Sequence, residues 1–533
     1  MPVFLTSNPT IFAQEDLRIA ISGVDTAHSN FLDLSVKLEA AFTNTYETWR
    51  EIALVLQAQP TAEYAHMPTL STYASDFGVM LAWLRVIEDA AQSKKTTFVF
   101  CTDPWLFQAL QFLPHVQADK APRYWIASLR SNIRGYLART RAALLVLCAR
   151  WKLRHHRNDI TAHENWLLVY GHPDSNAQGH DAYFSDLMSQ FPTLKRMMHT
   201  DCGVTTAAKL ARDGRTKSLH SWGSYSSVIT LPFTKWRPNT STFDSKIAWL
   251  IKRAAAIEGQ GGSAAMTKWQ IHCQFAWLKS SQPQNVSWPW ENHPWERAFV
   301  RQTRRLNTHT LGYQHTVVGR HMFNQGADAN IDGLDSIPDQ ILLNGPAYKD
   351  DLVRHGIPDT RMTIIGAHRI NTHKLPTYSQ TGPVFLALSN NPGFAQQMID
   401  AARPLAEDGL PFIVKDHPLS PYDVQESINF THSRVPLDQL PPLRAVVYCT
   451  GTTGLEGILA NIPTLRFIPD SGVAMDILPA NVEVSTVTAS NLKTKLNTLS
   501  KPVISTANNL FPPPDIKKWR HLLETTPLGT DHG

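Results

Sequence analysis

Short apolar runs that end in polar turns recur along the last third of the chain, and stretches with a helical pattern separate them. Four runs predict strands: VFLALSNN (384–391), PFIVKDHP (411–418), RAVVYCTG (444–451) and TLRFIP (464–469). Helices are predicted between them at 393–409 and 455–462. Strands that alternate with helices at this spacing indicate an α/β fold with a parallel, doubly wound sheet.

A similar pattern occupies the middle of the chain. It begins at ENWLLVYGHPD (164–174), where an apolar strand runs into a polar turn, and a helix is predicted at 181–191. Further strands are predicted at 226–233, 310–318 and 339–345. Two Rossmann-like domains, 161–360 and 361–515, are therefore expected to face each other across a cleft, with a short tail at 516–533.

The first 122 residues predict a further, smaller α/β region. Strands are expected at 18–24 and 96–105, and helical patterns cover 33–58 and 76–92. With 533 residues, 43% apolar and 18% charged, the chain has the composition of a globular protein of several domains. Its five cysteines show no paired spacing, which predicts a reducing compartment and no zinc site.

No targeting or spanning segment is expected. The first sixteen residues lack the basic and then apolar order of a signal peptide, and no apolar run approaches the ~18 residues that cross a bilayer. A cytoplasmic protein is therefore predicted.

Positive charge is concentrated in one segment, 123–160, which predicts a basic amphipathic helix or linker. Nine basic and no acidic residues lie between Arg123 and Arg157, so the formal charge of +5 leaves 5 − 9 = −4 for the rest. Such a helix can lie on an anionic membrane surface, or it can be a linker whose apolar face packs on the protein. Nucleic acid is not expected as a partner, because no other segment combines basic and aromatic residues.

The turn after the strand 444–451 has the residues of a phosphate site. Glycine and threonine free backbone N–H groups and supply hydroxyl donors, and a helix begins directly afterwards. The donor-binding candidates from this and the two preceding strand ends are Ser389, Lys415, His417, Pro418, Thr450, Gly451, Thr452, Thr453 and Glu456. Glu456 could accept from ribose hydroxyls and His417 could donate to a phosphate, with Pro418 stiffening its turn. The alternative is an ordinary βα turn with capping residues.

The opposite side of the cleft needs a carboxylate or an imidazole that can take a proton from an acceptor hydroxyl. The segment SWPWENHPWERAFVRQ (287–302) offers Glu291, beside Trp290 and Asn292, since sugar faces pack on aromatic rings. Glu291 is preferred to Glu296, which could simply cap a helix, and Asp174 is the second choice. Gln314 and His315 end a predicted strand and could reach substrate; a buried histidine and core tryptophans are the alternative.

The order GYQHTVVGR, PDQILLNGPAYKDDLVRHGIP, IIGAHR, KDHP and TGTTGLEGILANIPTL resembles bacterial surface-carbohydrate glycosyltransferases of the GT-B fold. Within that group, His417-Pro418 followed by Thr452-Thr453 resembles the CMP-sugar-dependent sialyltransferases and β-Kdo transferases, whose His-Pro and Ser/Thr motifs bind the CMP phosphate. The resemblance implies transfer of an acidic sugar onto a surface polysaccharide or its lipid-linked precursor, without a metal or another cofactor.

The chain departs from related patterns at three points. Tyr448 stands eight positions before Glu456, where retaining enzymes that use UDP- or GDP-sugars carry a second glutamate. No Asp-x-Asp motif stands at a predicted strand end, and the acidic motif of the sialyltransferases is not recognisable. A CDP-polyol phosphotransferase, a sugar-nucleotide epimerase and a non-catalytic scaffold therefore remain as alternatives.

Overall fold

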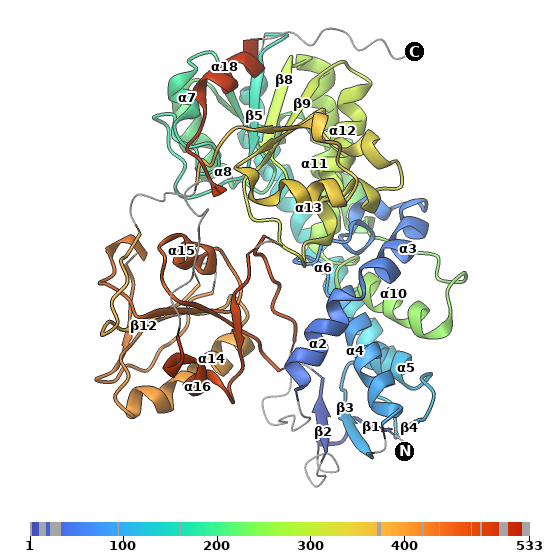
Figure 1. Ribbon diagram of the computed structural model, residues 1–533. Coiled ribbons are helices and arrows are strands. Elements are labelled where there is room, and N and C mark those ends of the chain that lie inside the picture. Colours follow the sequence, from blue (N-terminus) through green and yellow to red (C-terminus); the bar gives the residue numbers. More distant parts are fainter. Residues whose placement is uncertain are drawn as a thin grey trace.

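Three parallel β-sheets organise the molecule (Figure 1). The computed structural model describes residues 3–9, 17–21, 33–93, 95–158, 161–369, 375–417, 420–435, 437–470, 472–479, 482–499 and 510–524. Every pairing between neighbouring strands in the three sheets is parallel. Parallel strands need crossover connections, and helices supply most of them here.

The middle of the chain forms a seven-stranded sheet in the order β11-β10-β9-β8-β5-β6-β7. Its strands are β5 (Asn165–Val169), β6 (Lys195–Met198), β7 (Thr216–Ser218), β8 (Asn285–Pro289), β9 (His309–Gln314), β10 (Gln340–Leu343) and β11 (Met362–Ile364). The associated helices include α7 (Leu187–Gln190), α8 (Val204–Leu210), α10 (Ser245–Ile257), α11 (Gly262–Ser281), α12 (Pro294–Arg304) and α13 (Lys349–Arg354). We call this unit the acceptor domain, after the role that the sequence resemblance predicts for it.

The C-terminal part forms a six-stranded sheet in the order β14-β13-β12-β15-β16-β17. Its strands are β12 (Val384–Ala387), β13 (Phe412–Lys415), β14 (Phe430–His432), β15 (Ala445–Tyr448), β16 (Thr464–Phe467) and β17 (Ser485–Val487). In Figure 1, α15 (Thr453–Leu459) lies on one side of this sheet, and α14 (Pro392–Glu407) and α16 (Leu492–Asn497) on the other. We call this unit the donor domain, again after its predicted role. The expected pair of doubly wound, GT-B-like domains is thus confirmed by the topology.

The N-terminal region adds a four-stranded sheet in the order β2-β3-β1-β4. It contains β1 (Val3–Thr6), β2 (Arg18–Ala20), β3 (Thr97–Phe100), β4 (Val116–Ala118), α2 (Leu34–Thr43), α3 (Tyr46–Gln57), α4 (Phe77–Ala91) and α5 (Pro104–Leu110). One continuous buried cluster includes Leu5, Trp49 and Trp83 of this region together with Trp269 and Trp288 of the acceptor domain. The N-terminal region is therefore packed into the molecule through a shared core.

The helix α6 (Tyr124–Lys152) connects the N-terminal region to the acceptor domain and is visible in the middle of Figure 1. It packs against α5, α10 and α11 and against the short elements α9 (Tyr225–Thr230) and η6 (Leu231–Phe233). No helix among the residues that the structure describes is long and apolar enough to cross a membrane.

Several expected elements differ from the structure. Residues 226–233 were predicted as a strand but form α9 and η6, which lie against α6 and bury Val228 and Leu231. The predicted helix 33–58 is interrupted between α2 and α3, and only 187–190 of the predicted helix 181–191 is helical. The strands β6, β7 and β8 and the helices α10 and α11 were not predicted.

Two expected boundaries also shift. The strand β11 begins at Met362, beyond the expected boundary at 361, but pairs with β10 in the acceptor domain. The expected C-terminal tail contains α18 (Ile516–Glu524), whose buried Trp519 packs against Phe184 and His368 of the acceptor domain. Sequence pattern alone does not show which sheet a short terminal element joins.

Candidate active site

Three adjacent strands of the donor domain end at one edge of its sheet, in the order β13-β12-β15. Parallel strands bring their carboxyl ends together, which is where open α/β sheets bind ligands. Ser389 follows β12 and Thr450 follows β15, and their hydroxyl oxygens lie 3.4 Å apart. Asn391 caps α14 by accepting from the backbone N–H groups of Gly393 (2.9 Å) and Phe394 (3.3 Å). The edge therefore presents hydroxyl groups next to the start of a sixteen-residue helix.

The turn from β15 into α15 depends on glycine at two positions. Gly451 has φ +106°, a backbone conformation that side chains with a Cβ rarely adopt. A Cβ on Gly454 would lie 2.3 Å from the ring of Tyr448, which is buried below the turn. Tyr448, eight positions before Glu456, therefore fills the space beneath Gly454. α15 is short, from Thr453 to Leu459, and Thr452 and Glu456 lie in its first turn, Thr452 exposed and Glu456 half-buried.

Lys415 and His417 follow β13 on the other side of β12. The ammonium of Lys415 donates to the carbonyl of Val435 over 2.7 Å, which uses one of its three N–H donors. Burial lowers the pKa of His417, which keeps the imidazole neutral near pH 7. Pro418 lies outside the described residues.

On the facing domain, Glu291 lies between two histidines. It follows β8, and His315 follows the adjacent strand β9. The carboxylate of Glu291 is 2.6 Å from His293 Nε2 through one oxygen and 3.2 Å from His315 Nε2 through the other. His315 Nδ1 lies 3.5 Å from Arg369 Nη1. The structure thus brings two of the predicted catalytic residues, Glu291 and His315, into one cluster.

The carboxylate of Glu291 and the imidazole of His293 each stabilise the charged form of the other. Burial acts to raise the pKa of Glu291, but the contacts from His293 and His315 outweigh it and hold that pKa well below its usual range. Burial acts to lower the pKa of His293, but its hydrogen bond to Glu291 raises it overall. Glu291 is therefore an anion and His293 favours the protonated form. His315, which faces the other oxygen of Glu291, is the second imidazole of the cluster and the one that can serve as proton acceptor.

Glu296 has a structural role. Its carboxylate accepts from the backbone N–H groups of Glu291, Asn292 and His293 and from the indole of Trp288. Burial raises the pKa of Glu296 to about 7. The side chain is fully buried, so it holds the loop that presents Glu291 and does not face the cleft.

Three residues predicted to line the cleft are instead buried. Trp290 packs against Gly312 of the neighbouring strand and offers no face to a sugar. Asn292 has φ +56° and donates to the carbonyl of Asn324 over 2.6 Å, which fixes a neighbouring loop. Gln314 donates to the carbonyl of Thr316. These predictions were wrong because the side chain of a residue next to a strand end can face either the protein interior or the cleft, and the sequence does not show which.

Asp174 is separated from Glu291 by other side chains. Its exposed carboxylate lies 3.6 Å from His172, whose ring meets Tyr183, and Tyr183 in turn meets His315. No contact joins Asp174 directly to the Glu291 cluster among the described residues.

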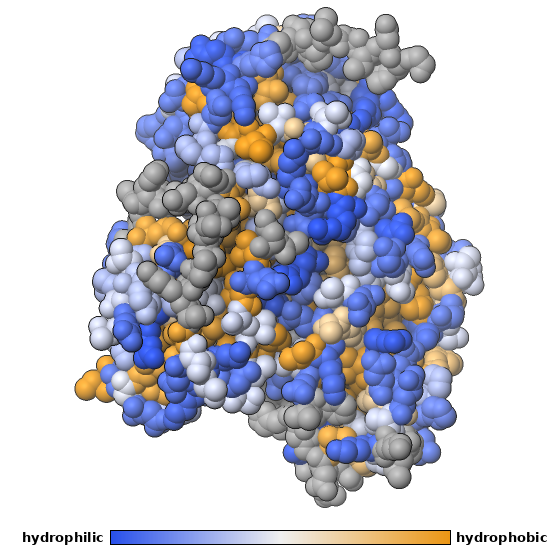
Figure 2. All heavy atoms as spheres, viewed as in Figure 1, coloured by the Kyte–Doolittle hydropathy of each residue, from blue (hydrophilic) through white to orange (hydrophobic). Residues whose placement is uncertain are grey.

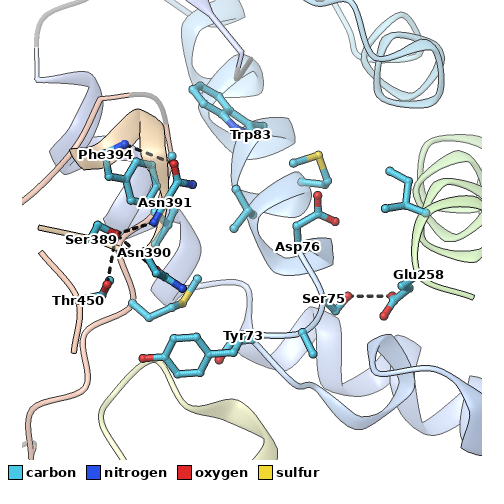
Figure 3. Close-up of a pocket in the computed structure, with 18 of the residues that line it drawn as sticks. Tyr73, Ser75, Asp76, Trp83, Glu258, Ser389, Asn390, Asn391, Phe394 and Thr450 are labelled. Carbon is cyan, nitrogen blue, oxygen red and sulfur yellow. Dashed lines mark hydrogen bonds between the residues drawn. The ribbon is translucent and has the colours of Figure 1, made fainter. Parts of the chain in front are cut away.

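A cavity of about 600 Å³ opens between the donor domain and the N-terminal region (Figure 3). Ser389, Asn390, Asn391 and Thr450 line one side, and Tyr73, Ser75, Asp76, Trp83 and Glu258 line the other. This volume is in the range of small-molecule sites. In Figure 2, hydrophobic residues are visible among hydrophilic ones along the seam between the donor domain and the rest of the molecule.

Tyr73 connects the cavity to the acceptor side. Its side chain lines the cavity and is 55% exposed. The surrounding protein and then the charge of Glu291 raise the pKa of its phenol, which places the phenol within electrostatic range of the carboxylate. The contribution of residues 72–83 was not predicted, because their sequence reads as an ordinary amphipathic helix and the preceding turn. Only tertiary packing brings α4 to the donor edge.

Metal ligands do not gather in the described ranges, where no group of three or more histidine, cysteine, aspartate or glutamate side chains is arranged to hold an ion. The absence of a metal thus stays a prediction from the sequence.

No protein-family model matches the chain, and neither does any curated protein sequence. Among solved structures, the glycotransferase of kitacinnamycin is similar at 12% identity and TM-score 0.38, over 68% of this chain and 95% of the other. A UDP-N-acetylglucosamine 2-epimerase is similar at 11% identity and TM-score 0.37, over the same shares of each chain. The lipopolysaccharide outer core galactosyltransferase WaaB is similar at 9% identity and TM-score 0.32, over 62% and 88%. At these scores the likeness carries no argument about activity.

Proposed function

We propose that the protein is a glycosyltransferase that binds a nucleotide-sugar donor at the carboxyl edge of the donor domain. The observation that carries this proposal is the pairing of two sites. A hydroxyl-lined edge with Ser389 and Thr450 forms one wall of the cavity, and Tyr73 lines the opposite wall. The carboxylate–histidine cluster of Glu291 and His315 lies behind that wall, within electrostatic range of Tyr73. Transfer of a sugar needs both a phosphate site and a proton acceptor.

The chemistry follows from the cluster. His315 Nε2 faces Glu291, and Nδ1, which lies 3.5 Å from Arg369 Nη1, would exchange that contact to accept the proton of an acceptor hydroxyl. The acceptor oxygen forms a bond to the anomeric carbon, the bond from that carbon to the donor phosphate breaks, and its electron pair leaves with the nucleoside phosphate. Hydroxyl and amide donors at the strand ends, with His417, stabilise the departing charge.

The donor is proposed to be a CMP-linked acidic sugar, Kdo or one like sialic acid, and the acceptor a bacterial surface polysaccharide or its lipid-linked precursor. This finer assignment rests on the resemblance of His417-Pro418 and Thr452-Thr453 to CMP-sugar transferases. It is supported by Tyr448, which stands eight positions before Glu456, where retaining enzymes that use UDP- or GDP-sugars carry a second glutamate. The proposed location is the cytoplasm, at the inner face of the membrane.

A nucleotide panel tests the proposal. CMP is expected to raise the melting temperature more than UMP, GMP or AMP, and His417→Ala should abolish the increase. A larger stabilisation by UMP or UDP would contradict the CMP assignment. Incubation with a CMP-sugar and acceptor should release CMP, whereas transfer of a phosphate to the product would favour a CDP-polyol phosphotransferase, and epimer formation without acceptor would favour an epimerase.

A further inference from the structure

The helix α6 carries an apolar stripe that the protein leaves uncovered. Its inward face is formed by Gly135, Arg139, Ala142, Val146 and Ala149, which are buried. A second face is exposed although it is apolar: the side chains of Trp125, Leu129, Ile133, Leu137, Leu144 and Trp151 are each 54–64% exposed. Burial of large apolar side chains is favourable, so an uncovered row of six indicates a binding surface.

Basic residues run alongside this stripe. Arg123, Arg130, Arg134, Arg141 and Lys152 are exposed and follow one another at seven, four, seven and eleven positions, spacings that return to one side of a helix. The apolar stripe spans about 39 Å at 1.5 Å per residue. A helix with adjacent apolar and basic stripes suits the plane of a lipid headgroup region.

A segment a hundred residues away widens the same face. Ile229 of α9 is 73% exposed and Phe233 of η6 is 64% exposed. Phe233 stands beside Tyr136 of α6, with ring centroids 6.1 Å apart. Two arginines of the basic helix are buried and hold this segment in place: Arg139 donates to the carbonyl of Pro232 over 2.9 Å, and Arg150 to that of Gly223 over 2.6 Å.

The charge of the surface specifies its partner. Neither 123–157 nor 214–243 contains an aspartate or glutamate. Burial and the neighbouring charges of Arg237 and Arg139 lower the pKa of Lys235, as expected where cations gather without anions. A second copy of the chain would bring two basic stripes together in a symmetric contact, which is unfavourable. Anionic phospholipids supply both the apolar layer and the negative charge.

We infer that α6, α9 and η6 form a docking face for a bilayer that contains anionic phospholipids. The face is one helix layer from the cavity: Ser131 of α6 donates to the carbonyl of Ala256, at the end of α10, and Glu258 two residues further lines the cavity. If the proposed glycosyltransferase function holds, docking brings the cavity close to a membrane in which a lipid-linked acceptor is anchored.

Flotation of the full-length protein with vesicles tests the face. The protein should float with vesicles of phosphatidylcholine and phosphatidylglycerol, and not with phosphatidylcholine alone. The triple variant Arg130→Gln/Arg134→Gln/Arg141→Gln should reduce partitioning about a hundredfold, since each basic residue near an anionic surface contributes about 1 kcal/mol. Leu137→Gln/Leu144→Gln should also reduce it, whereas the exposed controls Ile428→Gln and Arg305→Gln should not.

The inference is overturned if binding ignores vesicle charge, or if both sets of variants still float like the wild type. It is also overturned if the apolar variant abolishes a stable dimer, or if RNA binds and competes with vesicles. Melting curves check that the variants remain folded. Flotation without any nucleotide binding would leave the docking face intact and contradict only the proposed glycosyltransferase.

Discussion

Arg466 and Glu39 are 427 positions apart in the chain, and their side chains form an ion pair of 2.7 Å. Arg466 lies on β16 of the donor domain and Glu39 on α2 of the N-terminal region. Asp476 lies 3.8 Å from the same guanidinium and also pairs with Arg320 of the acceptor domain at 2.9 Å. One buried charge network thus joins all three parts of the molecule.

We expect Arg466→Met to destabilise the protein by about 3–5 kcal/mol, because it leaves the carboxylates of Glu39 and Asp476 without their shared cation. Urea unfolding followed by tryptophan fluorescence measures the loss. Lys493→Met is the matched control: its ion pair with Asp408 is exposed on both sides, so its loss should cost less than about 1 kcal/mol. Equal effects of the two substitutions would show that the network contributes little.

His315→Ala is expected to lower the rate of sugar transfer by about 10²–10⁴-fold, because it removes the proton acceptor. Glu291→Gln should also slow transfer, since the neutral amide no longer orients the imidazole as a carboxylate does. Nucleotide binding, measured by calorimetry, should be unchanged in both variants.

His172→Ala is the matched control for this site and should leave the rate unchanged, because among the contacts described its ring meets Tyr183 but none of Glu291, His293 and His315. Asp174→Asn distinguishes the second candidate. If Asp174→Asn abolishes transfer and His315→Ala does not, the assignment of the proton acceptor is wrong.

Thr450→Val and Ser389→Ala should each weaken nucleotide binding about tenfold, as expected for one hydrogen bond to a charged phosphate. Calorimetric titration with CMP measures the affinity. Ser490→Ala, in the same domain but hydrogen-bonded only to Thr488 among the contacts described, should bind CMP like the wild type. If Thr450→Val and Ser389→Ala both bind CMP with unchanged affinity, the phosphate does not bind at this edge of the sheet.

We expect the stability of the protein to decrease with rising pH because of Glu258. Burial raises the pKa of its carboxyl to about 8, against an ordinary value of 4.5. Between these values the folded protein retains a proton that the unfolded chain releases, so the free energy of unfolding falls as pH rises through this window. Glu258→Gln should remove this part of the pH dependence, and the exposed Glu407→Gln should not. Melting temperatures from about pH 5 to about pH 8 measure it.

The donor edge could be predicted closely because it is local. Strand, turn and helix follow one another within 444–462, and the glycines and Tyr448 that shape the turn are near neighbours in sequence. The acceptor side was predicted only in part. Glu291 and His315 occupy adjacent strand ends, but the direction of Trp290, Asn292 and Gln314 depends on how the sheet packs.

The order of apolar and polar positions determined the α/β class, the two Rossmann-like domains and the strands next to Thr450 and His315, because periodicity and turn chemistry act over a few residues. Only the tertiary structure decided that α4 forms a wall of the cavity, that α18 returns to the acceptor domain, and that Glu39 pairs with Arg466. Such contacts depend on the shapes and charges of surfaces that meet across hundreds of positions, and no local pattern records them.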